Sequence, residues 1–504
     1  MAPTIPPLPS ALDRFESLDP ATGELLASWP VDDDRSIADA VDQARLAAQW
    51  WADLGYDGRR ERLLAWKGVI ARRIRQLAHQ VHRENGKPVD DAILEIVIAI
   101  DHIDWAAKHA RPVLGPRRVR PSLLSLNQQA WLEYQPFGVV GVIGPWNYPV
   151  FTPMGSIAYA LAAGNAVVFK PSELTPGVGA WLVDAFAQVV PEQPVLQLIT
   201  GSGETGAALC RSGVGKLAFT GSTATGKKVM ATCAETLTPV LIECGGKDAM
   251  IVDADADLDA AADAAAWGGL SNAGQTCVGI ERVYVVDAVY DEFLARLVAR
   301  LEVLRAGNDG EASYGPITMP GQLDIIRRHI DDALARGGRA VLGGAHSVHP
   351  PYVDPVVLVD VPADSPAMTD ETFGPTLAIA RVRDADEAVD RANASPFGLG
   401  SAVFSKSRGM ELARRVRSGM TSVNSAVGFA TVPALPFGGV GDSGFGRIHG
   451  ADGLREFSRA KAITKQRFPQ PITLTSFDRK PQSVTLLVKA VTAIHGRRGR
   501  WPTG

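Results

Sequence analysis

Apolar residues in the first 110 positions recur with the spacing of a helix. Ala, Leu and Ile stand three or four residues apart in residues 34–51 and 58–85, with Arg and Gln between them. This pattern predicts two amphipathic helices. A third helical pattern covers about residues 90–109, and a group of prolines then breaks it: Pro112, Pro116 and Pro121.

The pattern changes from residue 138 onward. Short apolar runs rich in β-branched residues alternate with helical segments or loops, which is typical of βαβ units on a parallel sheet covered on both faces. The predicted strands are 139–143, 166–169, 196–200, 217–220, 240–242 and 250–252, and the predicted helices are 154–163, 177–190, 204–212 and 223–234. A second α/β region is expected at about 245–436, with strands such as 283–286, 377–381 and 421–424. Residues 123–135 can also form strands, and we expect them to form an extended arm.

The composition is that of an ordinary globular protein. Of the 504 residues, 46% are hydrophobic and 21% are charged, which excludes a disordered chain, a collagen-like fibre and a disulfide-dense miniprotein. Lys and Arg number 51 against 55 Asp and Glu, for a net charge of −4. This balance argues against a dedicated nucleic-acid-binding protein.

The cysteines and the termini bear on the cellular compartment. Four cysteines are too few for a disulfide framework and form no C-x-x-C pair: Cys210, Cys233, Cys244 and Cys277. We therefore expect a reducing, cytoplasmic environment and no metal site. The Pro-rich residues 1–14 lack the apolar run of a signal peptide. The longest apolar run near the C-terminus, 484–494, is interrupted by Lys489 and is too short to span a bilayer. We expect the Gly/Arg-rich tail from Gly496 to be mobile.

Two glycine-rich loops are candidates for phosphate binding. Residues 201–206 match G-x-G-x-x-G between a predicted strand and helix, but the acidic residue expected about twenty positions later is absent from 207–234. This loop either cradles a pyrophosphate or is only a tight turn. In the second loop, Gly221, Ser222 and Gly226 surround the start of a predicted helix. The N–H groups there can hold a phosphate, although Ser222 can equally be a simple cap.

Four other polar residues follow predicted strands, where ligands bind in open parallel sheets. Lys170 and Glu173 could both reach a ribose diol or form a surface ion pair. Glu243 precedes two glycines, and Asn147 follows the strand at 139–143. Together with Cys277, which follows a run of small and polar residues, they could supply a nucleophile, a base and an oxyanion donor. The alternatives are a buried thiol, a solvated carboxylate and a turn residue.

Six motifs carry a resemblance that favours the functional interpretation. They are Pro-Trp-Asn-Tyr-Pro at 145–149, Lys-Pro-Ser-Glu at 170–173, Phe-Thr-Gly-Ser at 219–222, Glu-Cys-Gly-Gly-Lys at 243–247, Gly-Gln-Thr-Cys at 274–277 and Glu-Thr-Phe-Gly-Pro at 371–375. In this order, the chain resembles the NAD(P)-dependent aldehyde dehydrogenase superfamily. The resemblance extends from residue 19 past residue 444.

The resemblance implies a fold and a set of roles. The expected fold is α/β, with two Rossmann-like domains and a small β oligomerisation arm. Cys277 would be the nucleophile, Glu243 the base that activates water, and Asn147 an oxyanion donor. Lys170 and Glu173 would hold the adenosine ribose, Ser222 with Gly221, Gly226 and Trp146 would lie at the dinucleotide, and Glu371 and Phe373 would position the nicotinamide ribose and ring.

The expected domains follow the same resemblance. A dinucleotide-binding domain would take residues 1–118 and 139–244, with a return at 436–457. A catalytic domain would take residues 245–435. The oligomerisation arm and tail would take 119–138 and 458–504, which leads us to expect a homodimer or homotetramer.

The resemblance also frames the reaction and its alternatives. NAD is the expected cofactor because the Glu173 carboxylate would repel a 2′-phosphate, although NADP is possible. The uncharged loop 425–433, with Tyr148, Val150 and Phe151, predicts an apolar tunnel for medium-chain aliphatic or aromatic aldehydes. Succinate semialdehyde is the alternative substrate.

Two functions of another class stay open, a thioesterase or esterase and a non-catalytic structural protein. Cys244 and Ile448 depart from the family pattern, and Ile448 puts a distal proton relay in doubt.

Overall fold

The computed structural model describes residues 13–122, 125–469 and 476–496. The predictions for residues 1–12 and for the tail from 497 onward lie outside the described residues. The chain divides into two compact units, a main unit of Met1–Leu114 and Gln135–Arg459 and an arm unit of Gly115–Tyr134 and Ala460–Gly504. Among the described residues, no helix is long and apolar enough to cross a membrane.

The N-terminal helices confirm the helical pattern and correct two of its details. They are α1 (Asp34–Asp53), α2 (Gly55–Arg72), α3 (Ile74–Asn85) and α4 (Val89–Leu114). The predicted helix 58–85 is broken at Arg73, whose backbone is not helical. The break is invisible in the sequence because Ile70 and Leu77, on either side of it, keep a seven-residue apolar spacing. The helix predicted to end near residue 109 continues through Pro112, which lies in its last turn and removes only one N–H.

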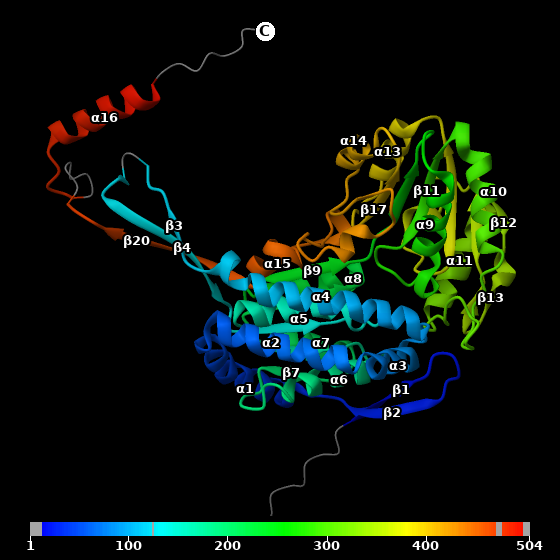
Figure 1. Cartoon of the computed structure of the whole chain (residues 1–504), viewed down its shortest axis with the longest axis horizontal. Helices are drawn as coiled ribbons and strands as arrows, with labels where there is room; N and C mark the ends of the chain where they lie inside the picture. The colour runs from blue at the N-terminus through cyan, green and yellow to red at the C-terminus, as the bar shows by residue number, and fades with distance from the viewer. Residues whose placement is uncertain (1–12, 123–124, 470–475, 497–504) are drawn as a thin grey trace, which may run out of the picture. The chain divides into compact units, whose positions relative to one another are not determined.

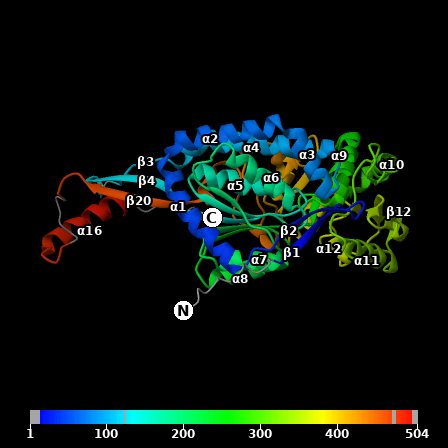
Figure 2. The same cartoon turned by 90° about the horizontal axis from the view of Figure 1, so that it is seen from below.

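The first sheet has six strands, and it confirms the alternating pattern. Its order is β19 (Gly444–Phe445), β9 (Val240–Cys244), β8 (Lys216–Gly221), β5 (Val139–Ile143), β6 (Ala166–Lys170) and β7 (Leu196–Leu198). All neighbours are parallel except β19 and β9. Figure 2 shows helices on both faces: α5 (Phe151–Ala163) and α6 (Pro176–Ala187) on one, α7 (Gly203–Arg211) and α8 (Thr223–Ala234) on the other.

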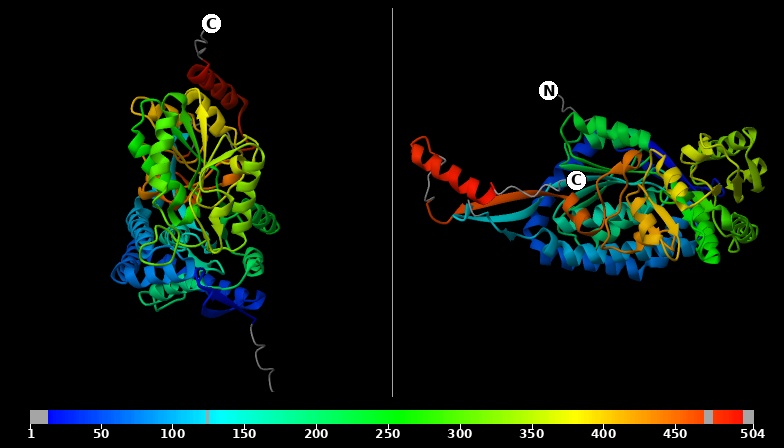
Figure 3. Two further views of the ribbon diagram at one scale, coloured as in Figure 1. Left: turned by 90° about the vertical axis from the view of Figure 1, so that its right-hand side faces the viewer. Right: turned by 90° about the horizontal axis from the view of Figure 1, so that it is seen from above.

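The second sheet has seven strands. Its order is β12 (Arg339–Leu342), β15 (Val356–Val359), β16 (Thr376–Val382), β11 (Ile280–Val286), β10 (Asp248–Val252), β17 (Ser401–Phe404) and β18 (Ser422–Val423). All pairs are parallel except β12 with β15. The strand predicted at 250–252 is β10 and therefore belongs to this sheet, not to the first. In the left view of Figure 3 the green and yellow strands of this sheet face the reader.

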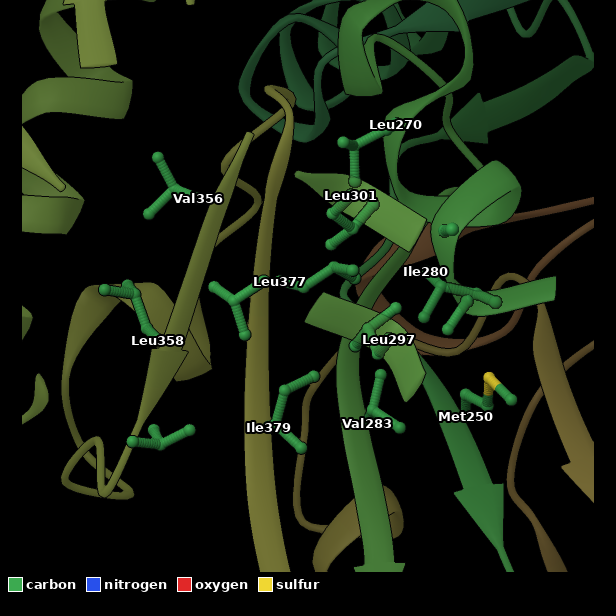
Figure 4. Packing of buried hydrophobic residues seen from close by; sticks show 14 of the residues in the cluster. Met250, Leu270, Ile280, Val283, Leu297, Leu301, Val356, Leu358, Leu377 and Ile379 are labelled. Carbon is green, nitrogen blue, oxygen red and sulfur yellow. The ribbon is translucent and has the colours of Figure 1, made fainter. Parts of the chain in front are cut away.

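The core of this second region fills the space between sheet and helices. Figure 4 shows Ile280 and Val283 of β11 beside Leu377 and Ile379 of β16, with side chains of two helices packed onto them. Those helices are α9 (Leu258–Leu270) and α10 (Tyr290–Leu301). The remaining helices of the main unit are α11 (Gln322–Ala335), α12 (Pro366–Thr369), α13 (Ala385–Asn393), α14 (Gly409–Arg415) and α15 (Gly450–Glu456). The fold class is thus α/β with two parallel-rich sheets, as expected.

Three smaller sheets complete the chain (Figure 1). A hairpin of β1 (Arg14–Leu18) and β2 (Leu25–Pro30) was not predicted, and β13 (Val348–His349) pairs with β14 (Tyr352–Val353). The third sheet has the order β20 (Ser458–Gln466), β4 (Gln128–Pro136) and β3 (Arg117–Val119). It contains the strands expected for the arm, and the helix α16 (Pro481–His495) follows it in the chain. The domain boundaries within the main unit stay a prediction.

Candidate functional site

The loop that carries Cys277 makes a left-handed turn. Asn272, Ala273 and Gly274 have φ values of 53°, 56° and 72°. The Asn272 amide holds this turn by donating to the carbonyl oxygens of Asn147 at 3.0 Å and Gln275 at 3.1 Å. A Cβ at Gly274 would lie 2.1 Å from the carbonyl oxygen of Gly374, so only glycine fits.

Asn147 lies next to this turn, at the end of β5. Its side-chain amide donates to the Gln275 carbonyl at 3.0 Å, and only 5% of the residue is exposed. The amide nitrogen has a second hydrogen, which can serve another acceptor. The structure therefore brings two of the predicted catalytic residues, Asn147 and Cys277, to the border of one cavity.

A buried ion pair that was not predicted holds the Asn147 loop. Lys87 donates to Glu95 at 2.7 Å and to the Asn147 carbonyl at 2.8 Å. The other oxygen of Glu95 accepts the N–H groups of Val150 at 2.7 Å and Phe151 at 3.0 Å. Because the pair joins the start of α4 to the loop after β5, no local motif could have indicated it.

Glu243 lies near the end of β9 and is 3% exposed. Among the described residues, neither of its carboxylate oxygens has a hydrogen-bond partner. Burial raises the pKa of Glu243 well above its usual range, and Arg447 offsets this only in part. The carboxyl is therefore placed to accept a proton rather than to serve as a permanent anion.

Glu243 and Cys277 face a second, largely apolar cavity. The uncharged residues on its walls include Leu94, Ile98, Tyr148, Phe151, Trp267, Val427, Ala430, Phe437 and Ile448. The expected tunnel residues Tyr148 and Phe151 are on these walls, whereas Val150 is fully buried and is not among the lining residues. Val150 points elsewhere because its position starts the α5 turn held by Glu95. Ile448 contributes a further apolar side chain to this cavity.

The Cys277 thiol is only partly exposed. Burial raises its pKa, and the carboxyl groups of Glu371, Asp248 and Glu243 raise it further. The thiol is therefore protonated at neutral pH in this structure. Its activation needs a base or a change in its surroundings.

A groove beside the first sheet brings together most of the residues predicted to bind a dinucleotide. A cavity of about 490 Å³ is bordered by Trp146, Lys170, Glu173, Gly221 and Ser222. Lys170 is buried, whereas Glu173 is exposed, and their charged atoms lie 3.9 Å apart. Ser222 caps α8 by accepting the N–H of Thr225 at 3.3 Å. The groove also meets Gly203 and Gly206 of the 201–206 loop.

Gly226 and Cys244 are buried packing positions and are not among the residues that line this groove. A Cβ at Gly226 would lie 3.0 Å from Ile242 and 3.1 Å from the Cys244 sulfur. Gly226 thus lets α8 approach β9 closely. The Cys244 thiol is buried, which raises its pKa to about 11, and it borders both cavities next to Cys277. Cys244 therefore occupies the position of a small core residue.

Glu371 and Phe373 border the same cavity as Asn147 and Cys277. Glu371 accepts the N–H of Gly246 at 3.2 Å, and burial raises its pKa to about 8. Phe373 has a left-handed backbone, and its ring meets Trp146 edge-on at 5.6 Å.

The loop that carries Glu371 and Phe373 is held by a second buried ion pair absent from the predictions. Lys247 pairs with Glu281, which also accepts the N–H groups of Thr372 at 2.9 Å and Phe373 at 2.9 Å. Lys247 itself donates to the Thr372 hydroxyl at 3.0 Å. Only Lys247 stood inside a recognised motif, and Glu281 is one of many acidic residues in the sequence.

Comparisons with known proteins identify the family to which the chain is similar. A model of the aldehyde dehydrogenase family matches residues 8–463. The chain is 38% identical over 451 residues to a 4,4′-diapolycopene aldehyde oxidase from a Methylomonas species, covering 89% of this chain and 85% of the relative. It is 32% identical over 489 residues to a Mycobacterium ulcerans (strain Agy99) protein named as a succinate-semialdehyde dehydrogenase (NADP⁺), covering 95% and 94%. An NAD-dependent aldehyde dehydrogenase structure from Sinorhizobium meliloti superposes with a TM-score of 0.87 at 30% identity, covering 92% and 93%.

Proposed function

The chain belongs to the aldehyde dehydrogenase family, and from this premise we propose that Cys277 carries the oxidation of an aldehyde to its carboxylic acid through a covalent thioester. One observation carries the proposal: Cys277 borders two cavities. One is apolar and holds Glu243, and the other meets Asn147, Glu371 and Phe373. An aldehyde and a dinucleotide can thus approach the same sulfur, each from one of the two cavities.

The first half of the reaction forms a carbon–sulfur bond. The Cys277 thiol gives its proton to water, the thiolate forms a bond to the aldehyde carbon, and the carbonyl oxygen gains the negative charge. The second hydrogen of the Asn147 amide and the backbone N–H of Cys277 are the proposed donors to that oxygen. One such donor is worth about 10²–10³ in rate. A bound nicotinamide would accept the hydride from the same carbon, which leaves a thioester on Cys277.

The second half hydrolyses the thioester. Glu243 is the proposed base, and its carboxylate takes a proton from the attacking water. The absence of hydrogen-bond partners on its oxygens supports this role, because a paired carboxylate would be a poorer base. The Ser443 hydroxyl does not donate to Glu243, because it donates to the Gly245 carbonyl at 2.8 Å.

The groove beside the first sheet fits a dinucleotide. The N-terminus of α8 presents N–H groups and the Ser222 hydroxyl, which suit a pyrophosphate. Lys170 and Glu173 suit the two hydroxyls of an adenosine ribose. When bound, the cofactor would supply the hydride acceptor, and Glu371 with Phe373 would orient its nicotinamide end.

We propose NAD rather than NADP as the preferred cofactor. The exposed Glu173 carboxylate would meet a 2′-phosphate with like charge, and its neighbour Lys170 is buried and turned toward the Pro171 carbonyl at 3.0 Å. Relatives and structural neighbours of this chain include both NAD- and NADP-dependent proteins. The measurement is the ratio of kcat/KM for the two cofactors, and Glu173→Gln should move that ratio toward NADP. A wild-type ratio that favours NADP would contradict the proposal.

The proposed substrates are medium-chain aliphatic or aromatic aldehydes. Besides its apolar walls, the aldehyde cavity is bordered by Lys87, Asp91, Glu95 and Glu243. Since the single ammonium is already paired with Glu95, a substrate carboxylate would meet carboxyl groups without a free cation. An apolar tail gains about 0.8 kcal/mol per buried CH₂.

Succinate semialdehyde remains the second candidate, favoured by the name of the Mycobacterium ulcerans relative. The test is to measure kcat/KM for hexanal, benzaldehyde and succinate semialdehyde in parallel. A preference of tenfold or more for the semialdehyde would overturn the apolar assignment.

The reaction class itself is tested by NADH absorbance with a panel of aldehydes. We expect NADH formation with wild-type protein, and with Cys277→Ala we expect none while dinucleotide binding persists. Ester or thioester hydrolysis without NADH formation would instead favour a hydrolase. No turnover of any kind would favour a structural protein.

A further inference from the structure

The helix α16 (Pro481–His495) exposes apolar side chains that a globular protein normally buries. Eight of its fifteen residues are apolar, and none of the fifteen is buried. Val484, Leu486, Val488 and Ile494 are each between 41% and 57% exposed. The helix is red in Figure 1. The proposed aldehyde chemistry assigns nothing to it.

The apolar residues lie on one side of the helix. At 100° per residue, the apolar side chains cover more than half of the circumference: Val484, Leu486, Leu487, Val488, Ala490, Val491, Ala493 and Ile494. A narrow polar stripe runs along the other side: Gln482, Thr485, Lys489 and Thr492. A helix that packs on another helix needs only a narrow apolar stripe. An apolar face as broad as this one suits the acyl chains of a lipid layer.

Apart from Asp478, the charges next to the helix in the sequence are all positive. From Arg479 to the C-terminus the sequence holds no Asp or Glu and six basic residues: Arg479, Lys480, Lys489, Arg497, Arg498 and Arg500. Residues 1–478 therefore carry a net charge of −10, whereas this last segment carries +6. Of the six, Arg479, Lys480 and Lys489 lie in the described part and are exposed. This charge is complementary to anionic phospholipid headgroups.

We propose that α16 binds the surface of an anionic lipid bilayer, with its apolar face among the acyl chains and with Arg479, Lys480 and Lys489 at the headgroups. The helix lies along the surface because fifteen residues extend only about 22 Å, less than the roughly 30 Å of a bilayer core. Lys489, at the edge of the apolar face, can reach the headgroups with its long stem. Attachment would place the enzyme beside a phase that dissolves apolar aldehydes. This consequence rests on the proposed function, whereas vesicle binding is measured without turnover.

The experiment is co-sedimentation of the full chain with sonicated vesicles of phosphatidylcholine, with and without 30 mol% phosphatidylglycerol. Two charge-neutral double variants are compared. Leu487→Gln/Val491→Gln removes apolar side chains from the broad face, and Thr485→Gln/Thr492→Gln is the matched control on the polar stripe. Glutamine keeps helix propensity high in both variants. Light scattering measures the oligomer mass of each protein.

We expect the wild-type chain to bind vesicles that contain phosphatidylglycerol, with binding about tenfold or more weaker on pure phosphatidylcholine or at 0.5 M salt. The apolar-face variant should bind about tenfold or more weakly, and the control within about twofold of wild type. The proposal is wrong if the wild-type chain does not bind, or if both variants bind alike. It is also wrong if the apolar-face variant changes the oligomer mass, because the helix would then pack on a second copy.

Discussion

At the scale of single residues, the electrostatic state of the candidate site is set by burial. Glu243, Cys277 and Glu371 all have raised pKa values, and burial is the largest cause for each. Burial disfavours the charged form of an acid, so each group holds its proton to higher pH than it would in water. The proposed reaction needs the deprotonated forms of Cys277 and Glu243. We therefore expect the site to be more reactive in alkaline solution.

The upward shift of the Glu243 pKa determines how the proposed base depends on pH. Because its pKa is raised, the carboxylate fraction grows as pH rises above the ordinary range of a glutamate. We expect kcat of the wild-type enzyme to increase with pH over the range in which Glu243 loses its proton. Glu243→Gln should remove this increase and lower kcat by about 10²–10⁴. The measurement is a steady-state pH profile combined with rapid-quench detection of the first turnover.

The first turnover separates the two halves of the reaction. Since acylation does not use Glu243 in the proposed mechanism, Glu243→Gln should retain a burst of NADH that is large relative to the steady state. An unchanged steady-state rate in this variant would exclude Glu243 as the base for deacylation.

Close packing at Gly245 gives a second prediction at this scale. A Cβ at Gly245 would lie 1.9 Å from an oxygen of Glu371, whereas a Cβ at Gly203, in the dinucleotide groove, would meet no atom within 4 Å. Gly245→Ala should displace Glu371 and raise KM for the dinucleotide by about tenfold or more, in line with the cost of overpacking. Gly203→Ala is the control and should leave KM within about twofold. The check is cofactor titration of both variants, and equal KM values would contradict the packing argument.

At the scale of elements, short buried strands were predictable, whereas the hairpin of β1 and β2 was not. Strand β5 matches its predicted range and β6 differs by one residue, because a buried parallel strand must be a continuous β-branched run. The hairpin of β1 and β2 was missed because it lacks such a run, and Leu18 and Leu25 are exposed. The break at Arg73 was missed because the apolar spacing continues across it.

Cys277, Glu371 and Phe373 were predicted from the motifs, and the other site residues were predictable where they follow strands. Glu243 lies at the end of β9 and Lys170 ends β6, so the sheet alone indicates that they share an edge. Lys87 and Glu95 could not be found in this way. Their pairing depends on how α4 meets the loop after β5, which is a tertiary contact between distant segments.

The Lys87–Glu95 pair leads to a prediction about stability. Both side chains are at most 1% exposed. Lys87→Met would leave Glu95 buried without its partner and should lower the free energy of unfolding by about 3–5 kcal/mol. Lys108→Met, which removes an exposed partner of Asp104 on the same helix, should cost less than about 1 kcal/mol. Urea unfolding of both variants is the measurement, and similar losses would show that the buried pair is not structurally important.

At the scale of the whole molecule, the arm unit predicts self-association. The strand β20 is an outer strand of its three-stranded sheet, and eight of its nine residues are exposed. An exposed outer strand of this length offers unpaired backbone groups to another chain. We expect at least a dimer, with a mass of twice 53.5 kDa or more by light scattering. A mass of one chain at micromolar concentration would contradict this expectation.

The near-contact of Gly274 with the Gly374 carbonyl has a kinetic meaning. It joins the turn before Cys277 to the loop that carries Glu371 and Phe373, with no room for a side chain between them. Neither loop can shift without pushing the other. Binding of a dinucleotide in its groove should therefore change the surroundings of the Cys277 sulfur. The dinucleotide and the aldehyde should then not bind independently. Initial-rate patterns would then show an ordered addition, in which the first ligand prepares the thiol for the second.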